Sequence, residues 1–384
     1  MKQRFPVILL AAAFLCLVPL TAGEPPGETT MLGLPPVPIP DDNPMSAAKI
    51  ELGKKLFEDK RFSATGKISC ATCHDATKGF TDGPLKTSKG IEDLRGTRNA
   101  PTVINAAYFT TQFWDGRSPS LEDQSLHPFL NPVEMGLLSH DPILEIARTD
   151  SDYVAMFKDV FGKKGKKITM DEVTKAIAAF ERTQVGGNSP FDHYYFKASD
   201  DALTDAQKRG FDLFVNEGRC VSCHRVEQTT ALFTDNKFHN IGVGINNIQN
   251  DVPELASAFL EADLSLAEVD VKVLSDPRTS EIGRFAVTHG FDDLGGFKTS
   301  TLRNIALTAP YFHDGSVATL REAVVHYNNG GVTNEGDPVN DFLSGGVRPL
   351  NLTDEQIDDL VAFMEALTSP EFAELMAEAE GGKP

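Results

Sequence analysis

Hydrophobic residues recur three and four positions apart in two stretches of the chain, a spacing that places them on one face of a helix. The stretches are Val173, Ile177 and Phe180, and further on Ile357, Leu360, Val361, Met364 and Leu367. A threonine followed three positions later by Glu or Gln forms a capping box, which marks where a helix begins. Such pairs stand at Thr169/Glu172, Thr204/Gln207 and Thr353/Gln356. We therefore predict helices after these three threonines, with the apolar stripes packed in a core.

The N-terminal pattern is that of a targeting segment. Lys2 and Arg4 precede a 14-residue apolar run, which ends shortly before the small residues Ala22 and Gly23. A basic start, a short apolar run and a small-residue site are typical of a secretory signal peptide, which we assign to residues 1–23. The run is shorter than the roughly 20 residues of a transmembrane helix. We expect a periplasmic mature protein without a membrane anchor, and an extended, proline-rich lead-in at residues 24–45.

Four of the five cysteines fall in two copies of one pattern, Cys-x-x-Cys-His, while Cys16 lies in the signal peptide. The copies are Cys70-Ala71-Thr72-Cys73-His74 and Cys220-Val221-Ser222-Cys223-His224. This is the c-type haem attachment pattern, in which both thiols bond to the haem and the histidine ligates its iron. A redox-active Cys-x-x-Cys needs no following histidine, and a zinc site would need the two pairs to converge. We predict two covalently bound haem c groups, with His74 and His224 as proximal ligands.

Three further motifs flank both copies in the same order. They are Gly53-x-x-Leu56-Phe57 and Gly210-x-x-Leu213-Phe214 before the sites, Phe80-Thr81-Asp82 and Phe233-Thr234-Asp235 after them, and Phe113-Trp114-Asp115-Gly116 with Leu121 against Phe312-His313-Asp314-Gly315 with Leu320. Repetition in one order indicates a duplicated one-haem domain. With the helical patterns it predicts an all-α fold of two tandem c-type cytochrome-like haem domains with long irregular loops.

The duplication also suggests where the domains divide. We place the N-terminal haem domain, which carries the peroxidatic haem, at residues 46–200, and the C-terminal, electron-transfer domain at 201–350. A C-terminal helix and tail occupy residues 351–384. Residues 241–296 show no pattern that we can assign, and we expect them to be irregular.

The amino-acid composition limits the kinds of partner that the protein can bind. The chain has 55 acidic and 36 basic residues, a net charge of −19, and 41% hydrophobic residues. This balance is globular and argues against nucleic acid or an anionic membrane surface as a partner. It suits a basic protein partner, although a solvated acidic surface is the preferred explanation of the charge.

Taken together, the motifs resemble the bacterial di-haem cytochrome c peroxidase family, which includes the MauG branch that oxidises residues of a partner protein. The segments that carry this resemblance are the two attachment sites, Phe113-Trp-Asp-Gly-Arg117, Leu302-Arg-Asn-Ile305 and Thr308-Ala-Pro-Tyr-Phe-His-Asp-Gly315. The resemblance runs from about Leu34 to Thr368. It implies an oxidoreductase that takes hydrogen peroxide at the His74 haem and receives electrons at the His224 haem.

The resemblance also implies roles for individual residues. Glu134 and Gln124 match the distal acid–base pair, although Glu134 taken alone reads as a solvated carboxylate. Trp114, the only tryptophan, matches an electron relay between the haems, although a sole tryptophan usually fills a core. The family binds calcium between its domains, and the matching positions are Asn99 and the backbone carbonyls of Thr308 and Pro310. His239, His289 and His313 are read as structural or propionate-pairing groups.

The repeat indicates what faces each iron on its distal side. Fourteen residues after Trp114 stands Pro128, and fourteen after His313 stands Tyr327. Proline has no ligand atom in its side chain, whereas tyrosine can bind ferric iron. We predict an open first haem and a second haem closed by Tyr327, a position that carries methionine in typical peroxidases and tyrosine in the MauG branch. His326 is the rival ligand, and a tyrosine packed on a surface helix is the plain alternative.

The loop after the first attachment site strengthens the prediction of an open haem. Many family members carry a histidine there that blocks the iron until the other haem is reduced. Here no histidine occurs between His74 and His127. The loop at about residues 86–95 therefore has no imidazole to offer the iron.

Three functions are compatible with these observations. The first is a periplasmic di-haem peroxidase that takes electrons from a small c-type cytochrome or copper protein. The second is a MauG-like enzyme that uses peroxide to oxidise Trp or Tyr side chains of a partner protein. The third is a non-catalytic electron-transfer cytochrome, which predicts two filled coordination sites and conflicts with Pro128 at the distal position.

Overall fold

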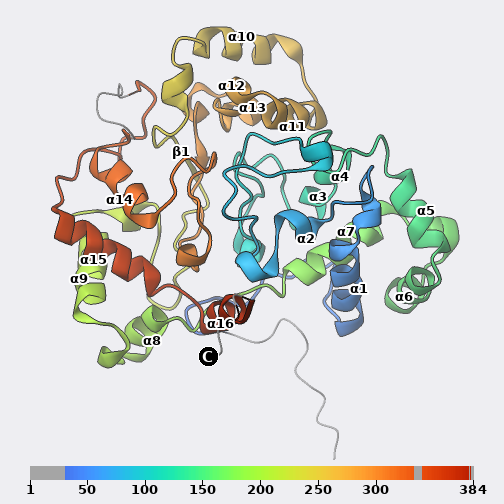
Figure 1. The fold of residues 1–384 in the computed structure, drawn as a ribbon, viewed down its shortest axis with the longest axis horizontal. Coiled ribbons are helices and arrows are strands. Elements are labelled where there is room, and N and C mark those ends of the chain that lie inside the picture. The colour runs from blue at the N-terminus through green and yellow to red at the C-terminus, as the bar shows by residue number, and fades with distance from the viewer. Residues whose placement is uncertain (1–30, 333–339, 380, 382–384) are drawn as a thin grey trace, which may run out of the picture.

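The computed structural model describes residues 31–332, 340–379 and 381, and the predicted signal peptide lies outside them. Two helical lobes stand side by side, and a further group of helices lies across one end of both (Figure 1). The predicted all-α fold is confirmed, since regular β structure in the described ranges amounts to one antiparallel pair, β1 (Phe238–His239) with β2 (Phe297–Lys298). No helix among these residues is long and apolar enough to cross a membrane.

The first lobe packs around its own hydrophobic core, to which Cys70 and Ala71 of the attachment segment also belong. Its helices are α1 (Ala47–Glu58), α2 (Cys70–Cys73), α3 (Leu121–Gln124), α4 (His127–Leu130), α5 (Asp141–Thr149), α6 (Ser151–Phe161) and α7 (Met170–Glu181). The predicted capping box at Thr169/Glu172 opens α7. The predicted stripe Val173, Ile177 and Phe180 faces this core.

The second lobe repeats the plan with a second core, which includes Cys220 and Val221. Its helices are α8 (Pro190–Lys197), α9 (Asp205–Val215), α14 (Leu320–Asn328) and α15 (Asp354–Glu365). The capping boxes at Thr204/Gln207 and Thr353/Gln356 open α9 and α15 as predicted. The two lobes are not strictly consecutive in sequence, because Phe372 of the C-terminal helix α16 (Pro370–Ala379) packs in the first core.

The backbone repeats as closely as the motifs do. Non-glycine residues with positive φ occur at matching places in both halves, a conformation that side chains disfavour and that persists where the fold requires it. The matching pairs are Phe80 and Phe233, Asn105 and Asn304, and Phe113 and Phe312. The lobes are therefore two copies of one unit at the level of individual turns.

The expectation that residues 241–296 are irregular was wrong. They form α10 (Val252–Ala262), α11 (Leu266–Ser275), α12 (Pro277–Ser280) and α13 (Phe285–Thr288) around a third hydrophobic cluster. These helices are the group that lies across the end of both lobes in Figure 1. The stripes are short, and Pro, Ser and Asp separate them, so no single helical pattern stands out in the sequence.

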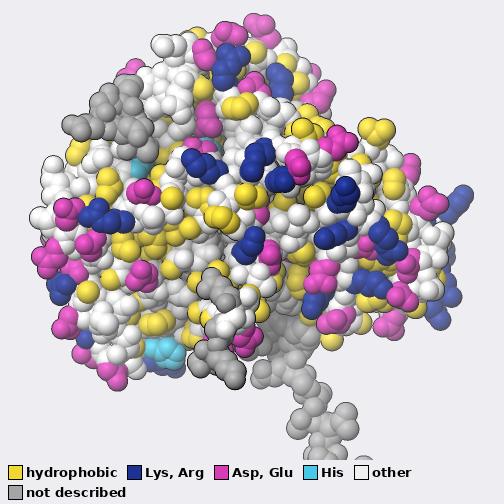
Figure 2. Space-filling view, viewed as in Figure 1, with side chains coloured by type: hydrophobic (Ala, Val, Ile, Leu, Met, Phe, Trp, Pro, Cys, Tyr) yellow, Lys and Arg dark blue, Asp and Glu magenta, His cyan; other side chains and the backbone are white. Residues whose placement is uncertain are grey.

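The proline-rich lead-in packs against the folded chain, and charges of both signs cover the visible surface. The described part of the lead-in has no helix or strand before α1, and its Leu34 and Val37 pack against Tyr108. Tyr108 also donates a hydrogen bond from its hydroxyl to the Pro35 carbonyl (3.0 Å). Figure 2 shows acidic and basic side chains interspersed over the visible face, as expected of a solvated surface.

Candidate active site

Each attachment segment is a short helix followed by a histidine whose ring is held by a backbone carbonyl. His74 follows α2 and its Nδ1 lies 3.2 Å from the Phe80 carbonyl oxygen, while His224 Nδ1 lies 2.9 Å from that of Phe233. An Nδ1–H that donates to a carbonyl leaves Nε2 available to a metal. None of the four cysteines of the two motifs takes part in a disulfide. Two thiols and one oriented imidazole in each lobe fit a covalently bound haem c.

A cavity lies beside His74 in the first lobe. Its walls come from the attachment segment, from residues 96–103, 112–117 and 121–135, and from side chains of α7 and α11. The structure brings Trp114, Gln124, Pro128 and Glu134 together in these walls. Apart from His74, its described lining contains no histidine, and the one methionine there, Met135, is part of the hydrophobic core.

Glu134 is placed by a tight turn after α4. Its backbone N–H donates to the Asn131 carbonyl (3.1 Å), and its own carbonyl accepts from the Ile91 N–H (2.9 Å). Its Oε2 is buried and has no hydrogen-bond partner among the described residues. Burial raises the pKa of Glu134 to about 8; the negative charge of Asp270 adds to the rise, and Arg117 opposes it. Glu134 is therefore a carboxylic acid that holds its proton at neutral pH.

The loop after the first attachment site packs directly on the Glu134 turn. Gly90 approaches so closely that a Cβ there would lie 2.1 Å from the Val133 carbonyl oxygen and 2.5 Å from that of Glu134. Ser88 and Gly96, near the two ends of the loop, line the cavity. The loop thus supports the segment that carries Glu134, and it contributes a serine hydroxyl rather than an imidazole to the cavity.

Three cavity features escaped the sequence reasoning. Glu181, the last residue of α7, lines the same cavity, and burial raises its pKa to about 8. Leu274 of α11 lines it from the helical insert. Asp270, one turn earlier on α11, forms a buried ion pair with Arg117 (2.7 Å). A lone carboxylate on a helix gives no sequence signal of such a role, because its partners come from distant segments.

Trp114 stands where the two halves meet. Its Nε1–H donates to the Asn99 carbonyl (2.9 Å), and its own carbonyl accepts from the Lys298 N–H of β2 (2.7 Å). It also lines the His74 cavity. The indole is therefore held between a segment of the first lobe and a strand of the second half.

The second attachment site has Tyr327 of α14 as its neighbour. Burial raises the pKa of the Tyr327 hydroxyl, and the nearby thiols of Cys220 and Cys223 add to that rise. His326 points elsewhere: its Nε2 lies 2.7 Å from the Ile241 carbonyl oxygen. Tyr327 is therefore the one of these two side chains that shares its surroundings with the attachment cysteines.

The three residues assigned to calcium lie where the lobes touch. The Asn99 N–H donates to the His313 carbonyl (2.7 Å), and the Asn99 amide nitrogen donates to the Lys86 carbonyl (3.2 Å). Gly83 of the first lobe packs against the Ala309 carbonyl, which lies between Thr308 and Pro310. The segments meet at one seam, and oxygen atoms of amide and carbonyl groups are ligands that calcium accepts.

Two of the three remaining histidines are paired with a carboxylate, and His289 lies near the Phe285 ring. His313 Nε2 lies 2.7 Å from a Glu281 carboxylate oxygen, and its ring stacks on Phe297 at 3.5 Å. His239 Nε2 lies 2.8 Å from an Asp235 oxygen. His289 ends α13 and is exposed.

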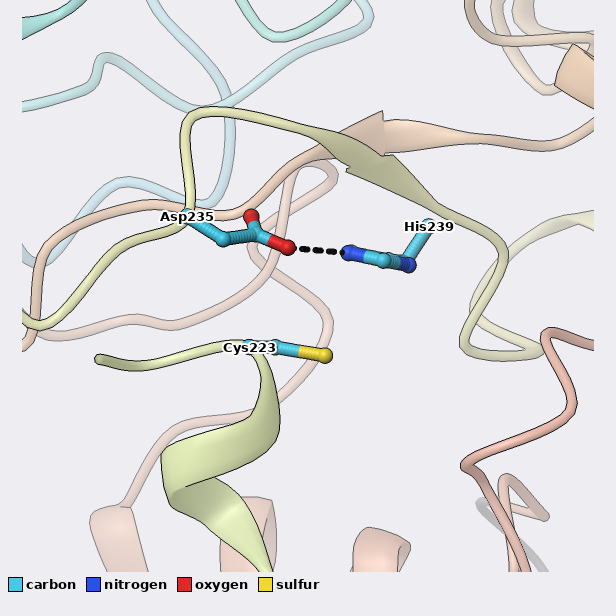
Figure 3. Close-up of side chains that lie close together, drawn as sticks. All are labelled: Cys223, Asp235 and His239. Carbon is cyan, nitrogen blue, oxygen red and sulfur yellow. Dashed lines mark hydrogen bonds and ion pairs between the residues drawn. The ribbon is translucent and has the colours of Figure 1, made fainter.

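The Asp235–His239 pair forms a cluster with Cys223 that has the composition of a metal site. Figure 3 shows the Asp235 carboxylate facing the His239 ring, with the Cys223 sulfur beside them. Their ligand atoms lie within 4.8 Å of one another. Cys223 is, however, the second cysteine of an attachment motif, where its sulfur is bonded to haem as a thioether. This cluster is therefore part of the surroundings of the second haem.

Known proteins settle the family. A profile of the di-haem cytochrome c peroxidase family matches residues 47–200. The cytochrome-c peroxidase IdrP1 of Denitromonas iodatirespirans is 34% identical over 95% of this chain and 93% of its own length. The methylamine utilization protein MauG of Methylorubrum extorquens is 35% identical over 86% of this chain and 81% of its own. The chain belongs to the di-haem cytochrome c peroxidase family.

Solved structures agree with this family. A MauG-like protein associated with microbial copper homeostasis superimposes with a TM-score of 0.71 at 32% identity, covering 88% of this chain and 95% of that one. The diheme peroxidase BthA of Burkholderia thailandensis gives 0.66 at 25% identity, covering 92% and 98%. As a di-haem cytochrome c peroxidase, the protein is an oxidoreductase that uses peroxide, and its cofactors are two haem c groups.

Proposed function

We propose that this di-haem peroxidase reduces hydrogen peroxide in the periplasm with electrons from a small c-type cytochrome or copper protein. The cavity beside His74 carries this proposal. Its walls bring together Glu134, an acid that holds its proton, and the amide of Gln124. They also include Pro128, which matches Tyr327 in the repeat and offers no ligand atom to an iron. The apolar run at residues 1–23 supports the periplasmic location.

Each half is assigned one task. Cys70, Cys73 and His74 would hold the first haem, which would supply the iron for the reaction with peroxide. Cys220, Cys223, His224 and Tyr327 would hold the second haem, which would supply the point of electron entry. The position of Tyr327 beside the attachment thiols supports this choice over His326.

Glu134 and Gln124 are assigned the proton chemistry. Breaking the O–O bond of peroxide requires a proton to leave the near oxygen and a proton to reach the far oxygen, and a positioned carboxyl group can do both. Because its pKa is about 8, Glu134 can both give and take a proton near neutral pH. Gln124 orients peroxide by hydrogen bonding, and Trp114 relays electrons between the two halves.

The MauG-like function is the second candidate, favoured by two observations. Tyr327 stands where typical peroxidases have methionine, and the loop at residues 86–95 packs on the Glu134 turn without a histidine. In that case peroxide would oxidise Trp or Tyr side chains of a protein substrate. A non-catalytic electron-transfer role is disfavoured by the carboxyl groups in the cavity, which such a protein does not need.

We also propose calcium at the seam between the lobes, bound by Asn99 and the carbonyls of Thr308 and Pro310. The meeting of their segments at one seam supports this assignment. Metal analysis of the dialysed protein tests it, and a protein that retains no calcium would contradict it.

The proposed function is tested by peroxide-driven oxidation of a reduced small c-type cytochrome by the purified holoprotein. We expect rapid oxidation by the wild type. Glu134→Gln and Gln124→Ala should be slower by about 10²–10⁴-fold, the contribution of acid–base help. Glu145→Gln, an exposed glutamate on α5, is the matched control and should not change the rate.

Two results would redirect the proposal. If both cavity variants turn over like the wild type, the acid–base pair is placed wrongly. If the cytochrome stays reduced while peroxide modifies Trp or Tyr of a partner protein, as mass spectrometry would show, the MauG-like function replaces the peroxidase.

A further inference from the structure

Asp270 connects the helical insert to the first lobe through two different groups. It is buried on α11, and its Oδ1 accepts hydrogen bonds from Arg117 Nε (2.8 Å) and Nη2 (2.7 Å). Its Oδ2 accepts one from Asn131 Nδ2 (2.7 Å). Both partners belong to segments that line the His74 cavity, whereas Asp270 comes from the other half of the chain.

Asn131 builds the turn on which Glu134 stands. Its backbone carbonyl accepts from the N–H groups of Glu134 (3.1 Å) and Gly136 (2.9 Å). Its side-chain Oδ1 accepts from the Val133 N–H (3.1 Å). The side-chain Nδ2 is thus left to anchor the whole turn, and Asp270 is the group that holds it. A buried amide held on both sides has one orientation.

Arg117 is the cation whose charge lowers the pKa of Glu134. It is buried, pairs with Asp115 (2.9 Å) and lies over the Phe113 ring at 3.6 Å. Asp115 in turn pairs with Arg98 (2.7 Å), so two arginines and two aspartates form one buried chain with balanced charge. Without the Asp270 charge, Arg117 and Arg98 would share Asp115 as their one remaining anion, and the unpartnered Glu134 carboxyl would be the next acid available to Arg117.

We propose that Asp270 is a positioning residue for Glu134: it anchors the Asn131 turn and keeps Arg117 engaged, so that Glu134 stays directed into the peroxide cavity with its proton. This inference rests on the proposed function and deepens it, since it assigns control of the peroxide site to a helix from the electron-transfer half. The acid and its regulator come from different halves of the duplicated chain.

Several other charged groups lie around Glu134 and its partners. Asp270 and Arg117 act on it most directly. His127 Nδ1 lies 3.9 Å from Asp270 and its Nε2 lies 3.4 Å from Asp123. The remaining groups around the cavity are Asp115, Arg98, Asp82, Glu181 and the attachment thiols of Cys70 and Cys73. The thiols are consumed by haem attachment and carry no charge in the holoprotein.

The test is Asp270→Asn in the holoprotein, with Asp263→Asn as the matched control. Both changes replace one acid by an amide, but Asp263 is exposed at the end of α10. In Asp270→Asn an NH2 group faces the Asn131 NH2, and the negative charge is lost. We expect the diferric protein to react with peroxide about tenfold more slowly or worse, as misplaced catalytic groups do. Asp263→Asn should react like the wild type.

A spectroscopic titration separates positioning from mere stability. The absorption spectrum of the ferric protein should show a transition near pH 8 as Glu134 ionises. The Asp270 charge raises the pKa of Glu134, so its removal should move this transition down by about one pH unit or more. Glu134→Gln should abolish the transition, and Asp270→Asn should have no further effect in that background.

The outcomes distinguish this inference from the proposed function. If Asp270→Asn lowers the melting temperature but leaves the transition at the wild-type pH, Asp270 is structural only and the inference is wrong. If Glu134→Gln itself reacts like the wild type, the proposed function fails first. Should Asp270→Asn not fold, Asn131→Ala removes the anchor and keeps the Asp270–Arg117 pair. That variant should slow the peroxide reaction, and a wild-type rate would overturn the inference.

Discussion

Glu134 and Glu181 line the same cavity, and each has a buried Oε2 without a hydrogen-bond partner among the described residues. Burial raises the pKa of each to about 8. Arg182, the cation next to Glu181, donates hydrogen bonds to both carboxylate oxygens of Glu122 (2.6 and 2.9 Å). Its charge is therefore balanced by Glu122 rather than by Glu181. At neutral pH the cavity beside His74 therefore holds two acidic protons.

The position of Tyr327 leads to a prediction about the fully ferric protein. A phenolate is a hard anionic donor that stabilises ferric iron, and Pro128 offers no ligand in the other half. Electron paramagnetic resonance of the untouched ferric protein should show one high-spin and one low-spin haem. Tyr327→Phe should remove the low-spin tyrosinate signature and leave the first haem able to bind small ligands. His326→Gln, the matched change at the rival ligand, should keep that signature.

The opposite resting state is equally recognisable. Two low-spin signals, with no reaction toward peroxide until one haem is reduced, would contradict an open first haem. The protein would then belong with the reductively activated peroxidases.

At the scale of elements, one helix crossing is built twice with glycine at its centre. Gly53 of α1 lies so close to α7 that a Cβ there would stand 1.9 Å from the Ala176 carbonyl oxygen. Gly210 of α9 lies equally close to α15, with 2.0 Å to the Asp359 carbonyl oxygen. The repeated glycines of the sequence therefore mark the close crossings of α1 with α7 in the first lobe and of α9 with α15 in the second.

These crossings predict the effect of one added methyl group. Alanine gains about 1 kcal/mol of helix propensity over glycine, but overpacking against a backbone typically costs about 1–3 kcal/mol. Because the clash is with a carbonyl that has no rotamer to change, we expect Gly53→Ala and Gly210→Ala to lower the free energy of unfolding. Gly345→Ala, where a Cβ meets nothing within 4 Å, is the control. Unchanged denaturant midpoints in both helix variants would contradict this packing.

At the scale of the molecule, each lobe has its own core around its own attachment segment. A pyridine haemochrome assay should therefore find two covalent haems per chain. The double variant Cys220→Ala and Cys223→Ala should retain one haem and the peroxide-binding signature of the first lobe. Cys70→Ala with Cys73→Ala should also retain one haem but lose that signature. A single haem in the wild type would overturn the duplication.

Local signals in the sequence were enough to predict three helices and to propose the attachment sites. Capping boxes at Thr169, Thr204 and Thr353 open helices because the cap and its partner are three residues apart. The Cys-x-x-Cys-His motif predicts haem for the same reason: all its ligand atoms come from five consecutive residues. The duplicated order of motifs extends this reasoning to two lobes of one plan.

Contacts between distant segments were decided only by the tertiary structure. Asp270 reaches Arg117 across 153 positions of sequence, and nothing in the local pattern of α11 indicates that partner. The insert at residues 241–296 was expected to be irregular, because its short apolar stripes acquire a common core only when its helices pack together. The sequence by itself was enough to predict the two haem sites, since covalent attachment is local. The acidity of the peroxide cavity depends on burial and on charges from both halves, and those exist only in the folded chain.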